Sequence, residues 1–251
     1  MDAVGVIPAR YASSRFPGKP LADLGGKPMI QHVYERAAQA SRLQQVIVAT
    51  DDRRIAEAVR AFGGRVQMTR GDHPSGSDRV GEVAATLDAD FIVNIQGDEP
   101  FIDPRAIDLT VETLEAHPDA PVATLVRPCD SVEELQSPNT AKVVLDDAGH
   151  ALYFSRAAIP FRRDETNSAN WLRDSSYFLH IGLYVYRKAF LLEFISWPPG
   201  RLERIEKLEQ LRILERGYRI ICAKTDYHAI GVDTPKDLAQ AQQILKEYGV
   251  A

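Results

Sequence analysis

The sequence has few cysteines and no long hydrophobic run. Its two cysteines, Cys129 and Cys222, lie far apart and outside any C-x-x-C pattern, so neither a disulfide framework nor a zinc site is indicated. We expect both to be buried thiols in a reducing compartment. No apolar run approaches the roughly 20 residues that span a bilayer, and the N-terminus lacks the basic and apolar regions of a secretory signal. These absences predict a cytoplasmic protein without membrane insertion.

The sequence also lacks an excess of positive charge. It carries 30 Lys and Arg residues against 35 Asp and Glu residues, a net charge of −5, which disfavours a nucleic-acid partner. The motifs of P-loop nucleotide hydrolases, serine hydrolases and zinc proteases do not occur. Any site for an anion must therefore depend on a local group of cations.

Short apolar runs alternate with segments of helical periodicity through much of the chain. Residues 3–7, 46–50 and 91–95 are typical of buried strands, and the segments between them place apolar residues at helical spacing. This alternation predicts an α/β fold with a mainly parallel sheet. With no linker or repeat visible, we expect a single domain over residues 1–251.

The alternation changes in the second half of the chain. Residues 142–154 contain two apolar segments joined by Asp-Asp-Ala-Gly, which predicts a β-hairpin within an inserted region at about 140–186. Residues 162–176 are polar and lack periodicity, as in a mobile loop. Residues 202–216 have helical periodicity and precede Gly217, which predicts one continuous helix.

An open, cationic loop follows the first predicted strand. Three prolines and a glycine keep residues 8–20 out of a helix, and the loop carries Arg10, Arg15 and Lys19 with no acid among them. Open α/β sheets bind ligands just beyond the carboxyl ends of their strands. The loop is therefore either a site for an anion with several oxygens, such as a nucleoside triphosphate, or an ordinary solvated loop.

Polar residues follow other predicted elements in the same way. Asp98 comes directly after the most apolar strand, where a carboxylate suits Mg²⁺ but also suits a polar turn; the cost of placing it there without a ligand favours the metal. Asp233 precedes the last helix and could simply cap it. The loop 73–79 could cap its helix through Ser and Asp, or reach a base or phosphate. Cations together with two separated acids suit nucleotidyl transfer with magnesium.

Several motifs resemble those of one enzyme family. The stretches are IPARYASSRFPGKPL, HPSGSDR, VNIQGDEP, ALYFSRAAIP, HIGLYVY, IEKLEQLRILE and GVDTPKDL, and they are distributed along nearly the whole chain. Together they resemble the 3-deoxy-manno-octulosonate cytidylyltransferases, or CMP-Kdo synthetases. The stretch PSGSDR departs from many relatives, which have Gln in place of Pro74 and Thr in place of Ser77. Serine in place of threonine keeps the hydroxyl.

The resemblance implies a doubly wound α/β sheet of the nucleotide-diphospho-sugar transferase-like fold, whose inserted β element forms a homodimer. It implies transfer of CMP from CTP to the acid sugar Kdo, with release of pyrophosphate, for lipopolysaccharide synthesis. The family positions imply four groups of site residues. The triphosphate would be held by Arg10, Arg15 and Lys19, the cytidine would lie near Pro8, Ala9, Ser75, Arg79 and Gln96, magnesium would bind Asp98 and Asp233, and Kdo would contact Arg156, His180, Tyr184, Glu209 and Gln210.

Other interpretations remain open at this point. His180 could be a core histidine and Glu209 an exposed helix acid. The acceptor could be 8-amino-Kdo or a sialate, although CMP-sialate synthetases have a sequence similar to GGSKR where this chain has YASSR. A non-catalytic nucleotide-binding module would be expected to lose one of the two metal carboxylates, and both are present.

Overall fold

The computed structural model describes residues 1–12, 16–165, 167–174 and 177–248. These residues divide into two compact units. Unit 1 comprises Met1–Asp108 together with Ala229–Ala251, and unit 2 comprises Leu109–His228. None of the helices within the described residues is long and apolar enough to cross a lipid bilayer.

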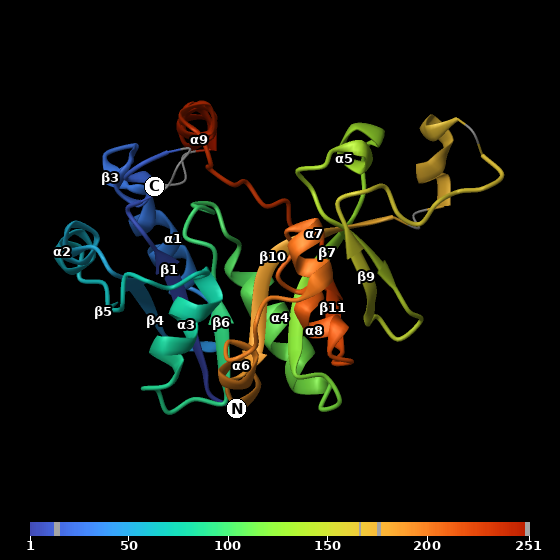
Figure 1. The fold of residues 1–251 in the computed structure, drawn as a ribbon. Coiled ribbons are helices and arrows are strands. Elements are labelled where there is room, and N and C mark those ends of the chain that lie inside the picture. The colour runs from blue at the N-terminus through green and yellow to red at the C-terminus, as the bar shows by residue number, and fades with distance from the viewer. Residues whose placement is uncertain (13–15, 166, 175–176, 249–251) are drawn as a thin grey trace. The chain divides into compact units, whose positions relative to one another are not determined.

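A parallel sheet forms the centre of unit 1 (Figure 1). Its strand order is β6-β1-β4-β5, and the register places Ile7 beside Val48 and Val6 beside Asn94. The strands are β1 (Ala3–Ala9), β4 (Leu43–Thr50), β5 (Val66–Met68) and β6 (Phe91–Asn94). The helices between them are α1 (Met29–Ala37), α2 (Arg53–Ala61) and α3 (Gly76–Ala84), and α4 (Pro104–Ala116) follows β6.

The C-terminal segment returns to the start of unit 1. Helix α9 (Pro235–Tyr248) lies beside the short strands β2 (Asp23–Leu24) and β3 (Lys27–Pro28). Figure 1 shows the helix in red and this N-terminal part of the chain in blue. Leu24 and Met29 share a buried cluster with Val232 and Ala241. This packing carries the residues just before α9 to the carboxyl-end side of the sheet.

Unit 2 has a mixed sheet. Strand β7 (Val122–Pro128) pairs in parallel with β11 (Ile220–Lys224) and antiparallel with β10 (Phe178–Arg187). The expected hairpin is present: β8 (Lys142–Leu145) pairs antiparallel with β9 (Ala151–Ser155), and Gly149 takes a φ of 88° in the turn. The helices of this unit are α5 (Val132–Gln136), α6 (Lys188–Phe194), α7 (Arg201–Glu206) and α8 (Leu211–Glu215).

The α/β class and the mainly parallel sheet are confirmed, and two local predictions are wrong. Residues 202–216 do not form one helix, because Lys207 takes a left-handed conformation with φ 55° between α7 and α8. The segment expected to be a loop at 162–176 contains the 3₁₀ helix η2 (Ser168–Asp174). The division into one domain with an insertion stays a prediction.

Candidate active site

The cationic loop begins where β1 ends. Pro8 and Ala9 are the last strand residues, and Arg10 extends into the exposed loop. The loop closes where Gly18 donates its N–H to the carbonyl of Tyr11 at 2.9 Å. Gly18 has a φ of 73°, which favours glycine, and a short 3₁₀ helix, η1 (Lys19–Leu21), starts directly after it. Arg15 lies outside the described residues.

The loop after β6 passes very close to the end of β1. A Cβ on Gly97 would lie 2.9 Å from the carbonyl oxygen of Pro8, so only glycine fits without a backbone shift. Gln96 and Asp98 flank this glycine. The close approach therefore brings Asp98 into the region of the cationic loop, as expected for neighbouring parallel strands.

Asp233 reaches the same place from the far end of the chain. The N–H of Val232 donates to the carbonyl of Asp98 at 2.9 Å, which ties the two segments together. The capping alternative for Asp233 is not supported, because the hydroxyl of Thr234 accepts from the N–H of Asp237 and the Asp237 carboxylate accepts in return from Thr234. The side chain of Asp233 therefore does not cap helix α9.

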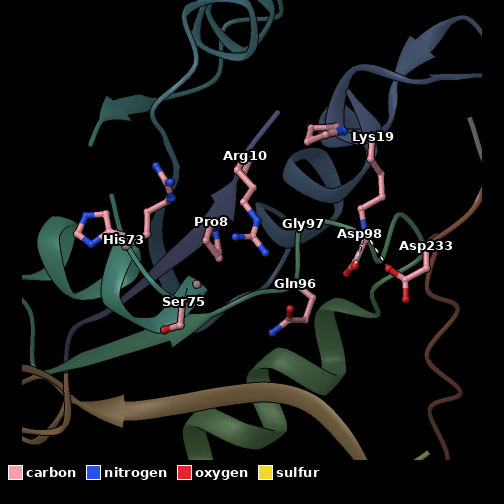
Figure 2. A pocket seen from close by; sticks show the side chains of 13 residues that line it. Pro8, Arg10, Lys19, His73, Ser75, Gln96, Gly97, Asp98 and Asp233 are labelled. Carbon is pink, nitrogen blue, oxygen red and sulfur yellow. Dashed lines mark hydrogen bonds and ion pairs between the residues drawn. The ribbon is translucent and has the colours of Figure 1, made fainter. Parts of the chain in front are cut away.

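A single ammonium group joins the two separated acids. The Nζ atom of Lys19 lies 2.7 Å from Oδ2 of Asp98 and 3.1 Å from Oδ1 of Asp233, and Figure 2 shows both carboxylates directed at it. The Lys19 side chain is only 14% exposed, so the contact is weakly screened by solvent. Two carboxylates thus converge on one cation beside Arg10.

Helix α3 supplies the other side of the pocket. Ser75 caps this helix, because its Oγ accepts from the N–H of Asp78. The capping interpretation is therefore confirmed, while contact with a nucleotide stays a prediction. Arg79 is buried, with one terminal nitrogen bonded to the hydroxyl of Thr69 and 3.2 Å from the carboxylate of Asp51.

The structure gathers most of the predicted nucleotide and metal residues around one pocket within unit 1. Four lining residues were not predicted as site residues. His73 is the first residue of a polar loop, and its Nε2 contacts the carboxylate of Glu82. Gly97 lies between Gln96 and Asp98, directly after a predicted strand. These two positions in the sequence could have indicated that His73 and Gly97 line the pocket. The pocket is lined by Pro8, Ala9, Arg10, Lys19, Pro20, His73, Ser75, Gly76, Arg79, Gln96, Gly97, Asp98 and Asp233.

The residues predicted for the acid sugar belong to unit 2. His180 and Tyr184 both lie on β10, with their rings 5.3 Å apart. Burial lowers the pKa of His180 to about 3 and raises that of Tyr184, so both side chains are neutral near pH 7. The Oγ atom of Thr124 is 2.8 Å from the carbonyl of Leu183, to which it donates, so it accepts from Nε2 of His180 at 3.0 Å. This network assigns the Nε2–H tautomer and leaves Nδ1 as an acceptor.

The other three residues lie at the ends of short segments. Arg156 follows β9, and its guanidinium donates to three backbone carbonyls: Nε to Glu206, Nη1 to Pro138 and Nη2 to Lys207. Gln210 precedes α8 and is 5% exposed, and its buried Nε2 has no hydrogen-bond partner. Glu209 is half-buried, with a carboxylate oxygen 3.5 Å from Arg212.

The fold and the pocket identify a class of enzyme. An α/β sheet with a cationic loop and two converging acids is the arrangement of nucleotidyl transfer, and the family model described as cytidylyltransferase matches residues 4–220. More distant solved structures share the fold alone; one is 4-diphosphocytidyl-2C-methyl-D-erythritol synthase from Anaerococcus prevotii, at 12% identity and TM-score 0.60, with 98% of this chain and 96% of that chain covered.

Closer similarities narrow the class to one family. A 3-deoxy-manno-octulosonate cytidylyltransferase from Solibacter usitatus is 53% identical, covering 97% of this chain and 94% of the relative. The enzyme of the same name from Geobacter sulfurreducens is 52% identical, covering 98% and 100%. A solved structure of CMP:2-keto-3-deoxy-manno-octonic acid synthetase complexed with CTP is 44% identical with a TM-score of 0.92, covering 99% and 100%. The chain therefore belongs to the 3-deoxy-manno-octulosonate cytidylyltransferase family, and the resemblance found in its motifs is confirmed.

Proposed function

We propose that this chain transfers CMP from CTP to Kdo and releases pyrophosphate, which activates Kdo for lipopolysaccharide synthesis. The convergence of Asp98 and Asp233 on Lys19, beside Arg10, carries the proposal. An acceptor oxygen of the sugar forms a bond to the α-phosphorus of CTP in line with the bond that breaks. The electrons of that bond leave with pyrophosphate, and the proton of the acceptor hydroxyl passes to the surroundings of the site.

The pocket in unit 1 would hold the nucleotide. Arg10 and Lys19 would bind the triphosphate oxygens, with Arg15 from the same loop, and their positive charge would stabilise the negative charge that develops on the leaving group. Pro8, Ala9 and Gln96 would lie against the cytidine. Ser75 and Arg79 would complete this wall, since Arg79 is held rigidly by Asp51 and Thr69.

The acidic pair fits a magnesium ion. Asp98 and Asp233 already direct one oxygen each to a common point, now taken by the Lys19 ammonium. Mg²⁺ prefers one or two carboxylates together with substrate phosphate oxygens, and within the described residues no larger group of metal-ligating side chains occurs. When bound, the ion would neutralise charge on the phosphates.

The residues of unit 2 suit a polyhydroxylated acid with one carboxylate. Three of the five N–H groups of Arg156 are used by carbonyls, which leaves one on each terminal nitrogen for a carboxylate. The unpartnered amide of Gln210 and the free Nδ1 of neutral His180 would bond sugar hydroxyls, with Tyr184 and Glu209 beside them. A buried amide without a partner is costly, so a substrate oxygen would offset that cost.

The decisive experiment measures pyrophosphate release with Mg²⁺ for each of the four nucleoside triphosphates against Kdo, 8-amino-Kdo and a sialate. We expect turnover with CTP that depends on Kdo. Preference for 8-amino-Kdo would shift the assignment to that acceptor. Equal turnover with UTP and a sugar phosphate, or nucleotide binding without turnover, would contradict the proposal.

Asp98→Asn provides a test of the acidic pair itself. The amide keeps the size of the side chain but removes the charge that holds a divalent cation, so we expect turnover to fall by about 100-fold or more with a cooperative unfolding transition. Asp90→Asn, whose carboxylate accepts from the N–H of Asp2 in the same unit, is the matched control. Near-normal activity of Asp98→Asn would make Asp98 a turn residue only.

A homodimer and a cytoplasmic location complete the proposal. The hairpin strand β9 supports the dimer, because Leu152 on this strand is 59% exposed. A large aliphatic side chain at that exposure suits a subunit contact.

A further inference from the structure

The corner between α7 and α8 holds Arg156 from two directions. The Glu206 carboxylate accepts from the hydroxyl of Ser155 at 2.7 Å and from the backbone N–H of Arg156 at 3.0 Å. The carbonyl of the same Glu206 accepts from Nε of Arg156 at 2.8 Å. One residue thus fixes both the backbone and the guanidinium of Arg156.

These carbonyls are available because the helix is interrupted. In a continuous helix the carbonyls of Glu206 and Lys207 would accept from the N–H groups of residues 210 and 211. Lys207 instead takes the left-handed conformation, and the N–H of Leu211 donates to Leu208. The freed carbonyls bond the guanidinium of Arg156.

A buried lysine steadies the opposite side of the guanidinium. Lys142 is fully buried, and its Nζ donates to the carbonyls of Ser137 and Thr140 at 2.7 and 2.6 Å. These residues enclose Pro138, whose carbonyl accepts from Nη1 of Arg156 at 2.8 Å. The guanidinium is therefore held on both sides before any ligand arrives.

We infer that Glu206 is a positioning residue for the acceptor site: it presets Arg156 so that one N–H of each terminal nitrogen faces the carboxylate of the acid sugar. This inference rests on the proposed function. The two carboxylate oxygens of Glu206 already accept hydrogen bonds from Ser155 and from the backbone N–H of Arg156, so the residue acts through Arg156. A preset fork avoids ordering a flexible arginine when the substrate binds.

The inference predicts an effect on one substrate only. Glu206→Ala should raise KM for Kdo by about 10- to 100-fold, the scale expected for a misplaced binding group, and leave KM for CTP within about twofold. Glu206→Gln keeps an acceptor oxygen for the N–H of Arg156 and should restore most of the affinity for Kdo. Glu193→Ala, which removes an exposed carboxylate of the same unit bonded to Tyr218, is the control.

A double-mutant cycle with Arg156→Ala separates positioning from direct contact. In the Arg156→Ala enzyme, a further Glu206→Ala change should alter KM for Kdo by less than about twofold. If Glu206→Ala does not fold, Glu206→Asp withdraws the carboxylate by one methylene and provides the same comparison. An unchanged KM for Kdo, or equal shifts for Kdo and CTP, overturns the inference, whereas a wild-type protein without Kdo-dependent turnover contradicts the proposed function instead.

Discussion

Asp233 shows what decides the role of a single residue. Its sequence context, before Thr-Pro and a helix, permits either a helix cap or a ligand. The structure gives the cap to Thr234 and directs the Asp233 carboxylate to Lys19. The sequence motif could predict that Asp233 lies at the end of a loop, but only the folded chain brings it to Asp98, 135 positions earlier in the sequence.

His180 should make the fold sensitive to acid. Its pKa of about 3 in the folded state lies below the usual value near 6.5 because of burial. As the pH falls below about 6.5, the unfolded chain binds a proton that the folded chain does not, so stability decreases toward pH 3. The loss is at most about 2 kcal/mol between pH 6.5 and 5, from 1.4 kcal/mol per pH unit.

Urea unfolding at pH 7.5 and 5.0 measures this loss. Wild type should lose more stability between the two values than His180→Gln, which keeps an N–H donor for Thr124 but does not titrate. His228→Gln, at an exposed position, should not reproduce the difference. Equal losses for wild type and His180→Gln would show that His180 takes up a proton in the folded state.

The alternation of strands and helices in unit 1 was predictable because each element carries its own periodicity. The continuous helix expected over 202–216 was not found, and its interruption has no local signal such as glycine or proline. The interruption coincides with a tertiary contact: the guanidinium of Arg156 donates to the carbonyls of Glu206 and Lys207, which a continuous helix would use for its own N–H groups. Local sequence patterns cannot reveal a competitor that lies 50 residues away.

The left-handed conformation of Lys207 leads to a stability prediction. A residue with a Cβ pays about 1–2 kcal/mol for this conformation, and glycine does not. Lys207→Gly should therefore be more stable than Lys207→Ala by about 1 kcal/mol in urea unfolding. The same pair at Arg204, inside α7, should show the reverse order by a similar amount. If alanine is the better residue at both positions, the left-handed bend at Lys207 is not present in solution.

The contact between the loops after β1 and β6 gives a second test at this level. Gly97→Ala would place a Cβ 2.9 Å from the carbonyl oxygen of Pro8, a backbone atom that cannot move alone. We expect a loss of about 1–3 kcal/mol in stability and a raised KM for CTP, because Asp98 moves with the loop. Gly231→Ala meets no atom within 4 Å and is the control. A variant with wild-type stability and KM would mean that the loops are further apart.

The order of the chain also explains which site residues could be found from sequence. The nucleotide and metal residues come from both ends of unit 1, and each follows a strand or precedes a helix, so its place at the sheet edge was predictable. The residues that hold these side chains were not predictable, because Asp51 and Thr69 contact Arg79 from distant segments of the chain. The same is true of Glu206, which contacts Arg156 of the predicted sugar site. The family motifs predict which residues bind the substrates, and the structure shows which residues hold them in place.

The proposed homodimer can be tested through Leu152, a large exposed apolar residue of the hairpin. On β9, Ala151 and Phe154 are buried, whereas Leu152 is 59% exposed, so a charge at this position can be solvated in an isolated chain but not in an apolar subunit contact. Leu152→Glu should convert a dimer into a monomer in light scattering coupled to gel filtration, with an unchanged circular dichroism spectrum. Ile205→Glu, at a similarly exposed aliphatic residue on α7, should remain dimeric. A Leu152→Glu protein that stays dimeric would move the subunit contact away from the hairpin, and a monomeric wild type would contradict the dimer altogether.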